Sequence, residues 1–327
     1  MKNKKIIIAG GTGFIGQELC NYFGNENEII ILTRRLPDQK TNAFGQNHVK
    51  QQVFKNISYV QWDAVTLGEW AATVEGADMI INLAGKTVNC RYNEKNKKEI
   101  FDSRTNAVKV IGLAIQQAIH PPKLWINAAS ATIYPHATDT ARDEYFTGFA
   151  DDFSVQVCKL WEKTFYDQRT PFTRKVALRM AITLGAGGVM IPYFNLLKFA
   201  LGGRQGNGKQ MYSWVHITDT CRMIEWIATH DELEGTYNCV SPNAVTNENF
   251  MQTLRKLAGH VIGLPAYKWM LAIGARLIGT EPELILKSRW VLPTRILATG
   301  FTFTYPLLED AFKEIISKTP RKSYHLF

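Results

Sequence analysis

Apolar and polar residues follow two alternating patterns along the first two thirds of the chain. Short continuous apolar runs are typical of buried strands, and between them apolar residues recur at helical spacing. The predicted strands are Ile6–Ala9, Ile29–Leu32, Met79–Leu83, Leu124–Ala128, Val176–Arg179 and Thr236–Cys239. The predicted helices are Ile15–Phe23, Asn106–Ile119 and Val155–Tyr166. This alternation predicts an α/β fold, a doubly wound parallel sheet with helices on both faces.

The pattern changes after residue 184, where glycine-rich loops interrupt it and the tail becomes mainly helical. We therefore predict a sheet domain from residues 1–184 and 216–241. Residues 185–215 and 242–327 then form a smaller, mainly helical region. Ligands of such sheets bind outside the carboxyl ends of the strands, so we expect the smaller region to lie on the substrate side.

A glycine-rich turn directly follows the first predicted strand. It reads Gly10-Gly11-Thr12-Gly13-Phe14-Ile15-Gly16 and leads into a predicted helix. Glycines at 10, 13 and 16 allow a sharp turn, a close approach of backbone to a pyrophosphate, and tight packing of helix on strand. The helix N-terminus also offers unpaired N–H groups to phosphates. Strand, turn and helix together predict a Rossmann dinucleotide site.

The end of the second strand bears on the choice of cofactor. NAD enzymes usually place an acidic residue there to bind the ribose hydroxyls. This chain has Thr33, Arg34 and Arg35 instead, and no acid before Asp38. A guanidinium binds a 2′-phosphate with two hydrogen bonds, whereas a carboxylate repels it. The sequence therefore favours NADP over NAD, although either arginine could also be a solvated surface charge.

Composition narrows the class of protein. The 327 residues carry a net charge of +9, but the basic residues are scattered and no nucleic-acid recognition motif accompanies them, so we expect no nucleic-acid partner. The five cysteines have no metal-ligand spacing, which predicts reduced thiols in a cytoplasmic protein and no metal site. The most membrane-like segment, Leu264–Gly279, is short and interrupted by Lys268 and Arg276, so we predict an amphipathic helix there and no membrane span.

These motifs resemble the extended short-chain dehydrogenase/reductases, the group that contains the nucleotide-sugar epimerases. The resemblance is specific to an atypical subgroup labelled "epimerase family", some members of which are called cell-division inhibitors, with a C-terminal domain of unknown function. The segments that carry it are GGTGFIG (10–16), TRR (33–35), NLAG (82–85), DSR (102–104), VCKLWE (157–162), SWVHITD (213–219) and VLP…GFTFTYP (291–306).

The resemblance implies a set of cofactor-binding positions. The glycine turn should line the pyrophosphate, the arginine pair should meet the adenosine phosphate, and the segment after the third strand should pass under the ribose. Asp63 stands where an acid of the family approaches the adenine, although a helix-capping role is an equal alternative. The implied residues are Gly10, Thr12, Gly13, Phe14, Ile15, Gly16, Thr33, Arg34, Arg35, Asp63, Leu83, Ala84 and Gly85.

One part of the family's active site is missing. Related enzymes use a Tyr-x-x-x-Lys pair on one helix, in which the ammonium lowers the pKa of the phenol. None of the twelve tyrosines of this chain has a lysine four residues later. The resemblance places Ser154 at the tyrosine position and Cys158 at the lysine position. A serine hydroxyl without an adjacent base is far too weak an acid to replace the phenol.

Three other groups are candidates for catalysis. Ser130 falls where the family's substrate-orienting serine ends a strand, and Tyr134 lies close by in the sequence. His216 is in a strand that lies beside the substrate in relatives. The competing interpretations are a turn-forming serine and a structural histidine.

Two functions remain open from the sequence. The first is an NADP-dependent oxidoreductase or epimerase-like enzyme that acts on a small anionic or nucleotide-linked substrate. The second is a non-catalytic NADP-binding protein that regulates a partner. The missing Tyr/Lys pair favours the second, and the retained Ser130 and SWVHITD strand favour the first. For the oligomeric state, the hypothesis that we carry forward is a homodimer.

Overall fold

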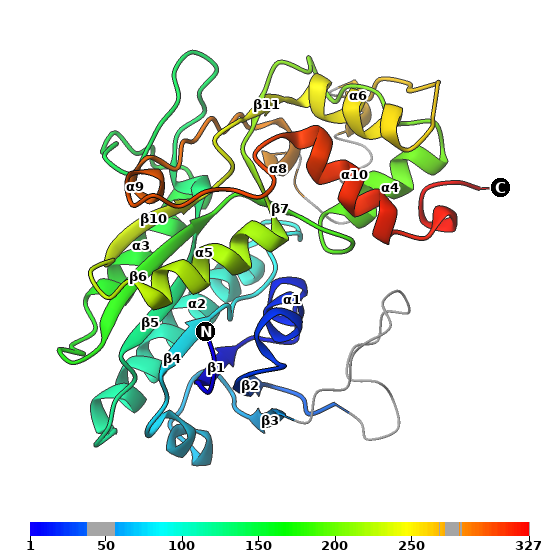
Figure 1. The fold of residues 1–327 in the computed structure, drawn as a ribbon. Coiled ribbons are helices and arrows are strands. Elements are labelled where there is room, and N and C mark those ends of the chain that lie inside the picture. Colours follow the sequence, from blue (N-terminus) through cyan, green and yellow to red (C-terminus); the bar gives the residue numbers. More distant parts are fainter. Residues whose placement is uncertain (38–55, 268, 272–280, 282, 327) are drawn as a thin grey trace.

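A seven-stranded, fully parallel sheet organises the N-terminal part of the molecule (Figure 1). The computed structural model describes residues 1–37, 56–267, 269–271, 281 and 283–326. The strand order is β10-β6-β5-β4-β1-β2-β3, so the direction of winding reverses between β1 and β4. The predicted doubly wound Rossmann fold is confirmed.

The elements have the following bounds. The strands are β1 Lys5–Ala9, β2 Glu28–Thr33, β3 Ile57–Gln61, β4 Met79–Asn82, β5 Leu124–Ser130, β6 Arg174–Met180, β7 Ile182–Leu184, β8 Met211–Tyr212, β9 Trp214–His216, β10 Gly235–Cys239 and β11 Val245–Thr246. The α-helices are α1 Phe14–Phe23, α2 Glu94–Gln117, α3 Phe153–Tyr166, α4 Met190–Lys198, α5 Ile217–Thr229, α6 Asn247–Leu257, α8 Glu283–Leu286, α9 Thr294–Ala298 and α10 Leu308–Lys318. The 3₁₀ turns are η1 Glu69–Val74, η2 Ala131–Ile133 and η3 Arg321–Ser323.

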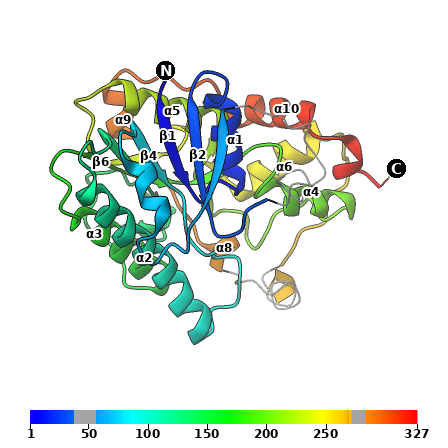
Figure 2. The same cartoon turned by 90° about the horizontal axis from the view of Figure 1, so that it is seen from below.

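Alternate residues of the strands fill two separate cores, one on each face of the sheet. Ile6 and Ile8 of β1 pack in a core with α1 and α5, whereas Ile7 and Ala9 pack in a core with α2 and α3. Figure 2 shows α1 and α5 on one side of the sheet and α2 and α3 on the other. Because both faces are covered, the strands are apolar throughout, which is the pattern that predicted them.

Two elements differ from the prediction. The edge strand β3 was not predicted, because its residues alternate between half-buried and exposed and form no continuous apolar run. Helix α2 begins at Glu94 instead of Asn106. Its first turns are mostly charged or polar, and the side chain of Asn93 caps them by accepting a hydrogen bond from the Asn96 N–H.

A smaller, mainly helical region stands beside the carboxyl edge of the sheet. Its core joins α4, α6 and α10, with Phe250 and Phe312 in T-shaped contact. The pair β7–β9 lies where the predicted boundary at 184 and 216 falls. The domain division itself stays a prediction, and most of the helix predicted at Leu264–Gly279 lies outside the described residues.

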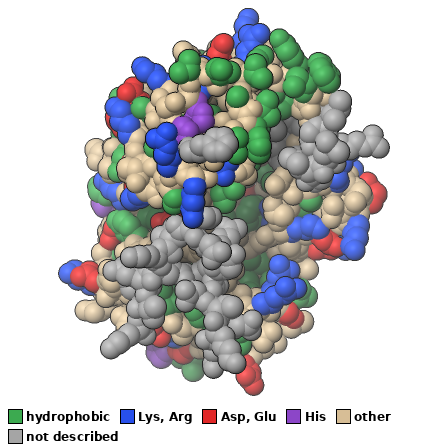
Figure 3. Space-filling model, turned by 90° about the vertical axis from the view of Figure 1, so that its right-hand side faces the viewer, with side chains coloured by type: hydrophobic (Ala, Val, Ile, Leu, Met, Phe, Trp, Pro, Cys, Tyr) green, Lys and Arg blue, Asp and Glu red, His purple; other side chains and the backbone are tan. Residues whose placement is uncertain are grey.

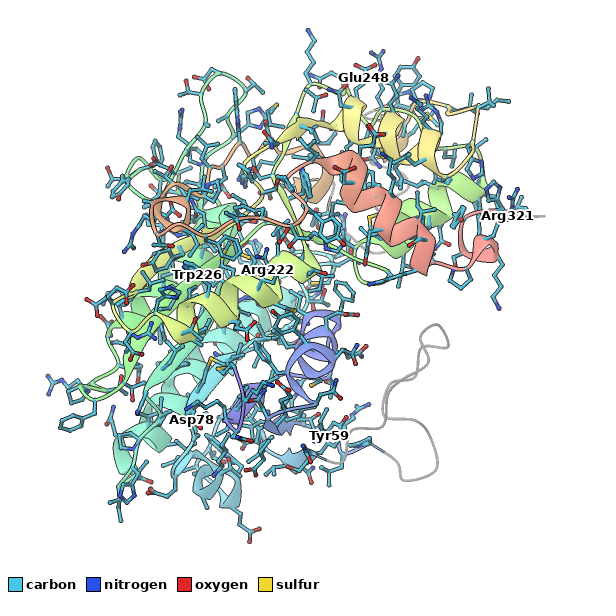
Figure 4. All side chains as sticks on the ribbon, viewed as in Figure 1. Tyr59, Asp78, Arg222, Trp226, Glu248 and Arg321 are labelled. Carbon is cyan, nitrogen blue, oxygen red and sulfur yellow. The ribbon has the colours of Figure 1, made fainter. Side chains whose placement is uncertain are left out.

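The C-terminal tail is hydrogen-bonded to the sheet domain through α5. The fully buried carboxylate of Asp219 accepts hydrogen bonds from the backbone N–H groups of Thr304 (2.7 Å) and Tyr305 (2.8 Å). Arg222 and Trp226, labelled in Figure 4, extend this contact along α5: Arg222 donates to the Thr302 carbonyl, and the Trp226 indole to the Thr299 hydroxyl. The two parts of the chain therefore share buried polar contacts.

Candidate functional site

A large cavity opens at the carboxyl edge of the sheet, between the ends of β1 and β4. Its volume of about 1090 Å³ lies above the usual range of roughly 300–1,000 Å³ for small-molecule sites. It is formed where the winding reverses, which is where ligands of such sheets bind. Its lining residues are Gly10, Thr12, Gly13, Leu32, Thr33, Arg34, Arg35, Trp62, Asp63, Ala64, Val65, Leu83, Ala84, Gly85, Lys86, Glu99, Asp102, Ser103 and Asn106.

The three glycines of the turn have different neighbours. Gly10 has a φ of +76°, and a Cβ there would lie 3.0 Å from the Ala84 backbone. A Cβ on Gly16 would lie 2.4 Å from the Gly11 Cα, so helix and turn could not pack. A Cβ on Gly13 would meet only the Gly10 carbonyl oxygen, at 3.7 Å. The fold therefore requires glycine at 10 and 16, whereas position 13 opens onto the cavity.

Helix α1 presents an N-terminus without a side-chain cap. Gly13 is its N-cap residue, and the first turn contains no acidic residue. The N–H groups of Phe14, Ile15 and Gly16 have no acceptor within the helix. These three residues do not line the cavity with side chains: the Phe14 ring lies against the loop 185–188, and Ile15 packs on the core. If they bind a ligand, they can do so through their backbone N–H groups.

The end of β2 presents two arginines to the cavity. The Thr33 hydroxyl donates to the Arg35 carbonyl (3.0 Å), which fixes a tight turn at this point. Arg34 and Arg35 are exposed, and neither guanidinium is in an ion pair or hydrogen bond within the described residues. Asp38, the nearest acid in the sequence, lies outside those residues. Two cations without a partner among the described residues therefore lie at one end of the cavity.

Asp63 lines the same end of the cavity but its carboxylate is engaged. It accepts hydrogen bonds from the backbone N–H groups of Val65 and Thr66 (both 2.8 Å) and from the Thr66 hydroxyl (2.7 Å). These bonds, those of Thr66 first, lower the pKa of the carboxyl. Asp63 thus shapes the tight turn that follows β3, a role close to the capping alternative, and it also lines the cavity.

The end of β4 is held by a buried amide pair that the sequence reasoning missed. The Asn82 side chain donates to Asn127 of β5 (2.7 Å) and accepts from the Ala84 N–H (3.0 Å). This contact turns the chain so that Leu83, Ala84 and Gly85 line the cavity. The sequence did contain a signal for this pair: two asparagines lie inside otherwise apolar strands. A buried amide needs a hydrogen-bond partner, so each asparagine could have been expected to bond to the other.

Ser130 ends β5 beside this edge and forms a turn. Its Oγ accepts a hydrogen bond from the Thr132 N–H (3.2 Å), and it is half-buried. Within the described residues its hydroxyl hydrogen has no acceptor, so the group keeps the capacity to donate. Ser130 itself is not among the residues that line the cavity.

The structure does not bring Tyr134 to the cavity. The side chain is fully buried, accepts a hydrogen bond from Arg179 (2.8 Å) and donates one to Asn238 (2.9 Å). Arg179 in turn forms a bidentate pair with Glu162 of α3, both bonds 2.8 Å. Burial raises the pKa of Tyr134 to about 12. Proximity in sequence to Ser130 was misleading, because η2 turns this ring into the core.

His216 is likewise committed to internal contacts. It is fully buried at the start of α5, where Nδ1 accepts a hydrogen bond from the Thr218 N–H (3.2 Å). Nε2 lies 3.1 Å from the Glu314 carboxylate of α10, and the ring packs on Tyr305 at 4.1 Å. The imidazole therefore caps α5 and contacts the C-terminal region, which is the structural alternative, and it does not face the cavity.

The positions of the missing Tyr/Lys pair are also occupied by internal contacts. Ser154 is buried, and its side chain interacts with the Tyr92 phenol, which arrives from the segment before α2. The Tyr92 ring packs against Phe153 at 4.8 Å, and burial raises the pKa of its phenol to about 12. Cys158 is buried too, and burial raises the pKa of its thiol to about 12, so the thiol is neutral.

Metal, membrane and nucleic-acid binding each place requirements on the described residues. Within them, no group of three or more His, Cys, Asp or Glu side chains is placed to hold a metal ion. No described helix has the length and hydropathy needed to cross a bilayer. On the face shown in Figure 3, Lys and Arg side chains are interspersed with acidic and neutral groups and form no continuous strip.

Known proteins match this sequence over nearly its whole length. Epimerase family protein YfhF of Bacillus subtilis (strain 168) is 30% identical over 319 residues, covering 95% of this chain and 98% of the relative. The crystal structure of human epimerase family protein SDR39U1 (isoform 2) with NADPH is 28% identical, with a TM-score of 0.81 over 96% of this chain and 99% of that one.

More distant structures show the same fold. UDP-glucuronic acid 4-epimerase of Bacillus cereus has a TM-score of 0.75 at 14% identity, over 96% of this chain and 98% of that one. Residues 268–315 match DUF1731, a domain of unknown function, as the resemblance implied. Residues 6–239, which contain the cavity and all of the parallel sheet except the first residue of β1, match the NAD dependent epimerase/dehydratase family, and the chain belongs to that family.

Proposed function

We propose that this protein binds NADP(H) in the cavity between β1 and β4. The observation that carries the proposal is the convergence of three features on one cavity: the uncapped α1 N-terminus, the open position at Gly13, and the unpartnered pair Arg34 and Arg35. N–H groups of a helix N-terminus bind phosphate oxygens, and guanidinium groups bind a phosphomonoester with paired hydrogen bonds.

The charges around the cavity fit a cofactor with a 2′-phosphate. Three acids line it, and each is engaged elsewhere. Asp63 accepts the hydrogen bonds of its own turn, Glu99 is paired with Lys86, and Asp102 is paired with Lys98. Within the described residues, Arg34 and Arg35 are thus the positive charges at the wall that form no ion pair. NADPH in the crystal structure of the human relative supports the same choice.

We further propose that the protein is an atypical NADP-dependent oxidoreductase or epimerase-like enzyme for a small substrate. A bound nicotinamide supplies or accepts a hydride. Ser130, at the end of β5, can donate a hydrogen bond to a substrate oxygen, because its Oγ already accepts from Thr132 and its own hydrogen is unused. The family's Tyr-x-x-x-Lys pair has no part in this proposal, because Ser154 and Cys158 stand at its positions.

A specific observation favours a second function, that of a non-catalytic NADP-binding protein that regulates a partner. Two of the three predicted acid–base groups, Tyr134 and His216, are fully buried and bonded within the protein. Ser130 alone remains at the edge of the sheet, and a serine without an adjacent base transfers protons poorly.

Calorimetric titration with NADPH tests the binding proposal, and absence of saturable binding would reject it. Turnover separates the two functions. NADPH absorbance is followed with secondary alcohols and nucleotide sugars, for wild type and Ser130→Ala. Turnover that falls in Ser130→Ala supports the enzyme. Binding of NADPH without turnover on any of these substrates supports the regulatory protein.

A further inference from the structure

Two partly buried arginines beside the cofactor cavity have no carboxylate partner. Arg104 of α2 and Arg289, which follows α8, form no ion pair within the described residues, whereas the buried Arg179 is fully paired with Glu162. Burial without a counter-charge disfavours the charged form, and desolvation lowers the pKa of both guanidinium groups. An arginine stays protonated at neutral pH, so the protein holds two positive charges here without a carboxylate in direct contact within the described residues.

Arg104 lies directly behind the cavity wall. Its Cζ is 3.3 Å from the position that a Cβ on Gly85 would occupy, and it lies over the Trp161 ring, 5.0 Å from the ring centroid. One nitrogen, Nη1, donates to the carbonyls of Lys86 and Ile100, both at 3.0 Å. Nε and Nη2 have no acceptor within the described residues. The contact with the ring holds the guanidinium in place and uses none of its N–H donors.

Arg289 approaches the same edge from the C-terminal region. Its Nη2 donates to the carbonyl of Thr132, two residues beyond the end of β5, at 3.3 Å. Nη1 makes an equally long bond to the Ser288 carbonyl. Its Nε is buried with no hydrogen-bond partner in the described structure. A buried donor without a partner costs free energy, so this nitrogen favours an acceptor that the protein itself does not provide.

No nearby carboxylate forms an ion pair with either guanidinium within the described residues. The Cys158 thiol, which is within the electrostatic reach of both arginines, is neutral at physiological pH. Asp152 and Glu283 act on Arg289, but both are bonded to Lys287, at 2.6 and 3.0 Å. Because β4 and β5 are parallel neighbours, Gly85 after β4 and Thr132 after β5 lie at the same edge of the sheet. The two arginines therefore flank this edge with N–H donors that no described acceptor uses.

We propose that Arg104 and Arg289 together bind the anionic group of the substrate, a carboxylate or a phosphate, beside Ser130. This inference rests on the proposed NADP(H) site, because it assigns the neighbouring end of that site to the substrate. Guanidinium groups bind both anions through paired N–H donors, so the chemistry is shared. The substrate class is then a small molecule with a negative group close to its reacting carbon.

The experiment measures anion binding to the full-length protein, with and without saturating NADPH. Inorganic phosphate and acetate are the probes, and the readouts are the fluorescence of bound NADPH and the melting temperature. Arg104→Gln and Arg289→Gln remove charge but keep a donor, and Arg289→Lys restores charge. Arg295→Gln is the matched control, since this half-buried arginine donates to the carbonyls of Thr236 and Glu234 at the opposite edge of the sheet.

We expect saturable binding of at least one probe by wild type, about tenfold or more weaker in each Gln variant. Arg289→Lys should recover part of it and Arg295→Gln should leave it unchanged. The probe that binds tells phosphate from carboxylate. No saturable response to either probe, or an equal response in the Gln variants, overturns the anion site. If the wild type does not bind NADPH, only the proposed cofactor site is overturned, because the anion response is also measured without NADPH.

Discussion

The two ends of the candidate site differ in what their polar groups are bonded to. At the cofactor end, the first N–H groups of α1 and the guanidinium groups of Arg34 and Arg35 have no protein partner in the described structure. At the expected catalytic end, Tyr134 and His216 are fully buried and hydrogen-bonded on both sides. Groups of the first kind are available to a ligand, and those of the second kind hold the protein together.

The difference shows which part of a family's pattern transfers safely by resemblance. Dinucleotide binding depends largely on backbone geometry, and a turn such as Gly10–Gly16 keeps that geometry whatever the rest of the chain contains. Proton transfer depends on individual side chains, whose availability is set by distant partners such as Glu314 for His216. Four substitutions test this division, from the largest expected effect to the smallest.

The first prediction concerns the buried pair at the catalytic end. Glu162→Ala leaves the Arg179 guanidinium buried without its bidentate partner, and we expect a loss of about 3–5 kcal/mol in unfolding free energy. NADPH affinity should not change in the folded fraction. Lys159→Ala is the control on the same helix, because its bond to Asp151 is exposed. Denaturant unfolding with a parallel NADPH titration gives the answer, and an unaffected stability would contradict the structural role.

The second prediction concerns the open position of the glycine turn. Gly13→Val should weaken NADPH binding about 100-fold or more, or about 2.7 kcal/mol, because the side chain enters the cavity. Its backbone, at φ −78° and ψ 171°, suits any residue, so folding should be preserved. Gly16→Ala is the contrasting variant, since its Cβ meets backbone and should lower stability instead. Calorimetry and circular dichroism distinguish the two. Full NADPH affinity in a folded Gly13→Val would make the turn purely structural.

The third prediction separates the two cofactors. Arg34→Ala should lower NADPH affinity about tenfold and leave NADH affinity unchanged, because only NADPH carries the 2′-phosphate. Arg35→Ala, measured beside it, shows whether the second exposed arginine shares the contact. Titration of both cofactors into all three proteins is sufficient. A wild type that binds NADH as tightly as NADPH would refute the assignment.

The fourth prediction is the smallest. Ser130→Ala removes the hydroxyl that accepts from the Thr132 N–H at the start of η2, and we expect a loss of about 0.5–1 kcal/mol in stability. Thermal unfolding measures it. NADPH affinity should stay at the wild-type value, and a clear drop would mean that the hydroxyl contacts the cofactor itself.

The sequence predicted the sheet well because its strands are buried on both faces. Six strands and three helices were expected, and the structure has an element at each position. The edge strand β3 and the first turns of α2 were missed, since both are half-exposed and lack the apolar period. Local periodicity records burial, so it cannot find an element that is only partly buried.

The site was predictable to the extent that it is local in sequence. The turn at 10–16, the arginines at 34 and 35 and the segment at 83–85 each follow a strand that could be recognised. Arg104 and Arg289 reach the same edge of the sheet only through the tertiary fold. No residue near Tyr134 in the sequence indicates that its phenol is hydrogen-bonded to Arg179 and Asn238. Contacts between residues far apart in the sequence decide which polar side chains are hydrogen-bonded within the protein. A single sequence does not show these contacts.

The buried carboxylate of Asp219 has a consequence at the level of the gene. Its two oxygens accept the N–H groups of Thr304 and Tyr305, which lie in the VLP…GFTFTYP tail. A premature stop codon ahead of Thr304 would remove both N–H donors and leave the buried Asp219 carboxylate, inside the NAD dependent epimerase/dehydratase portion, with Arg222 as its remaining partner among the described residues. Such a truncated product would lose stability in the sheet domain as well as in the tail. We therefore expect the stability of the region that matches one family to depend on the presence of the region that matches the other.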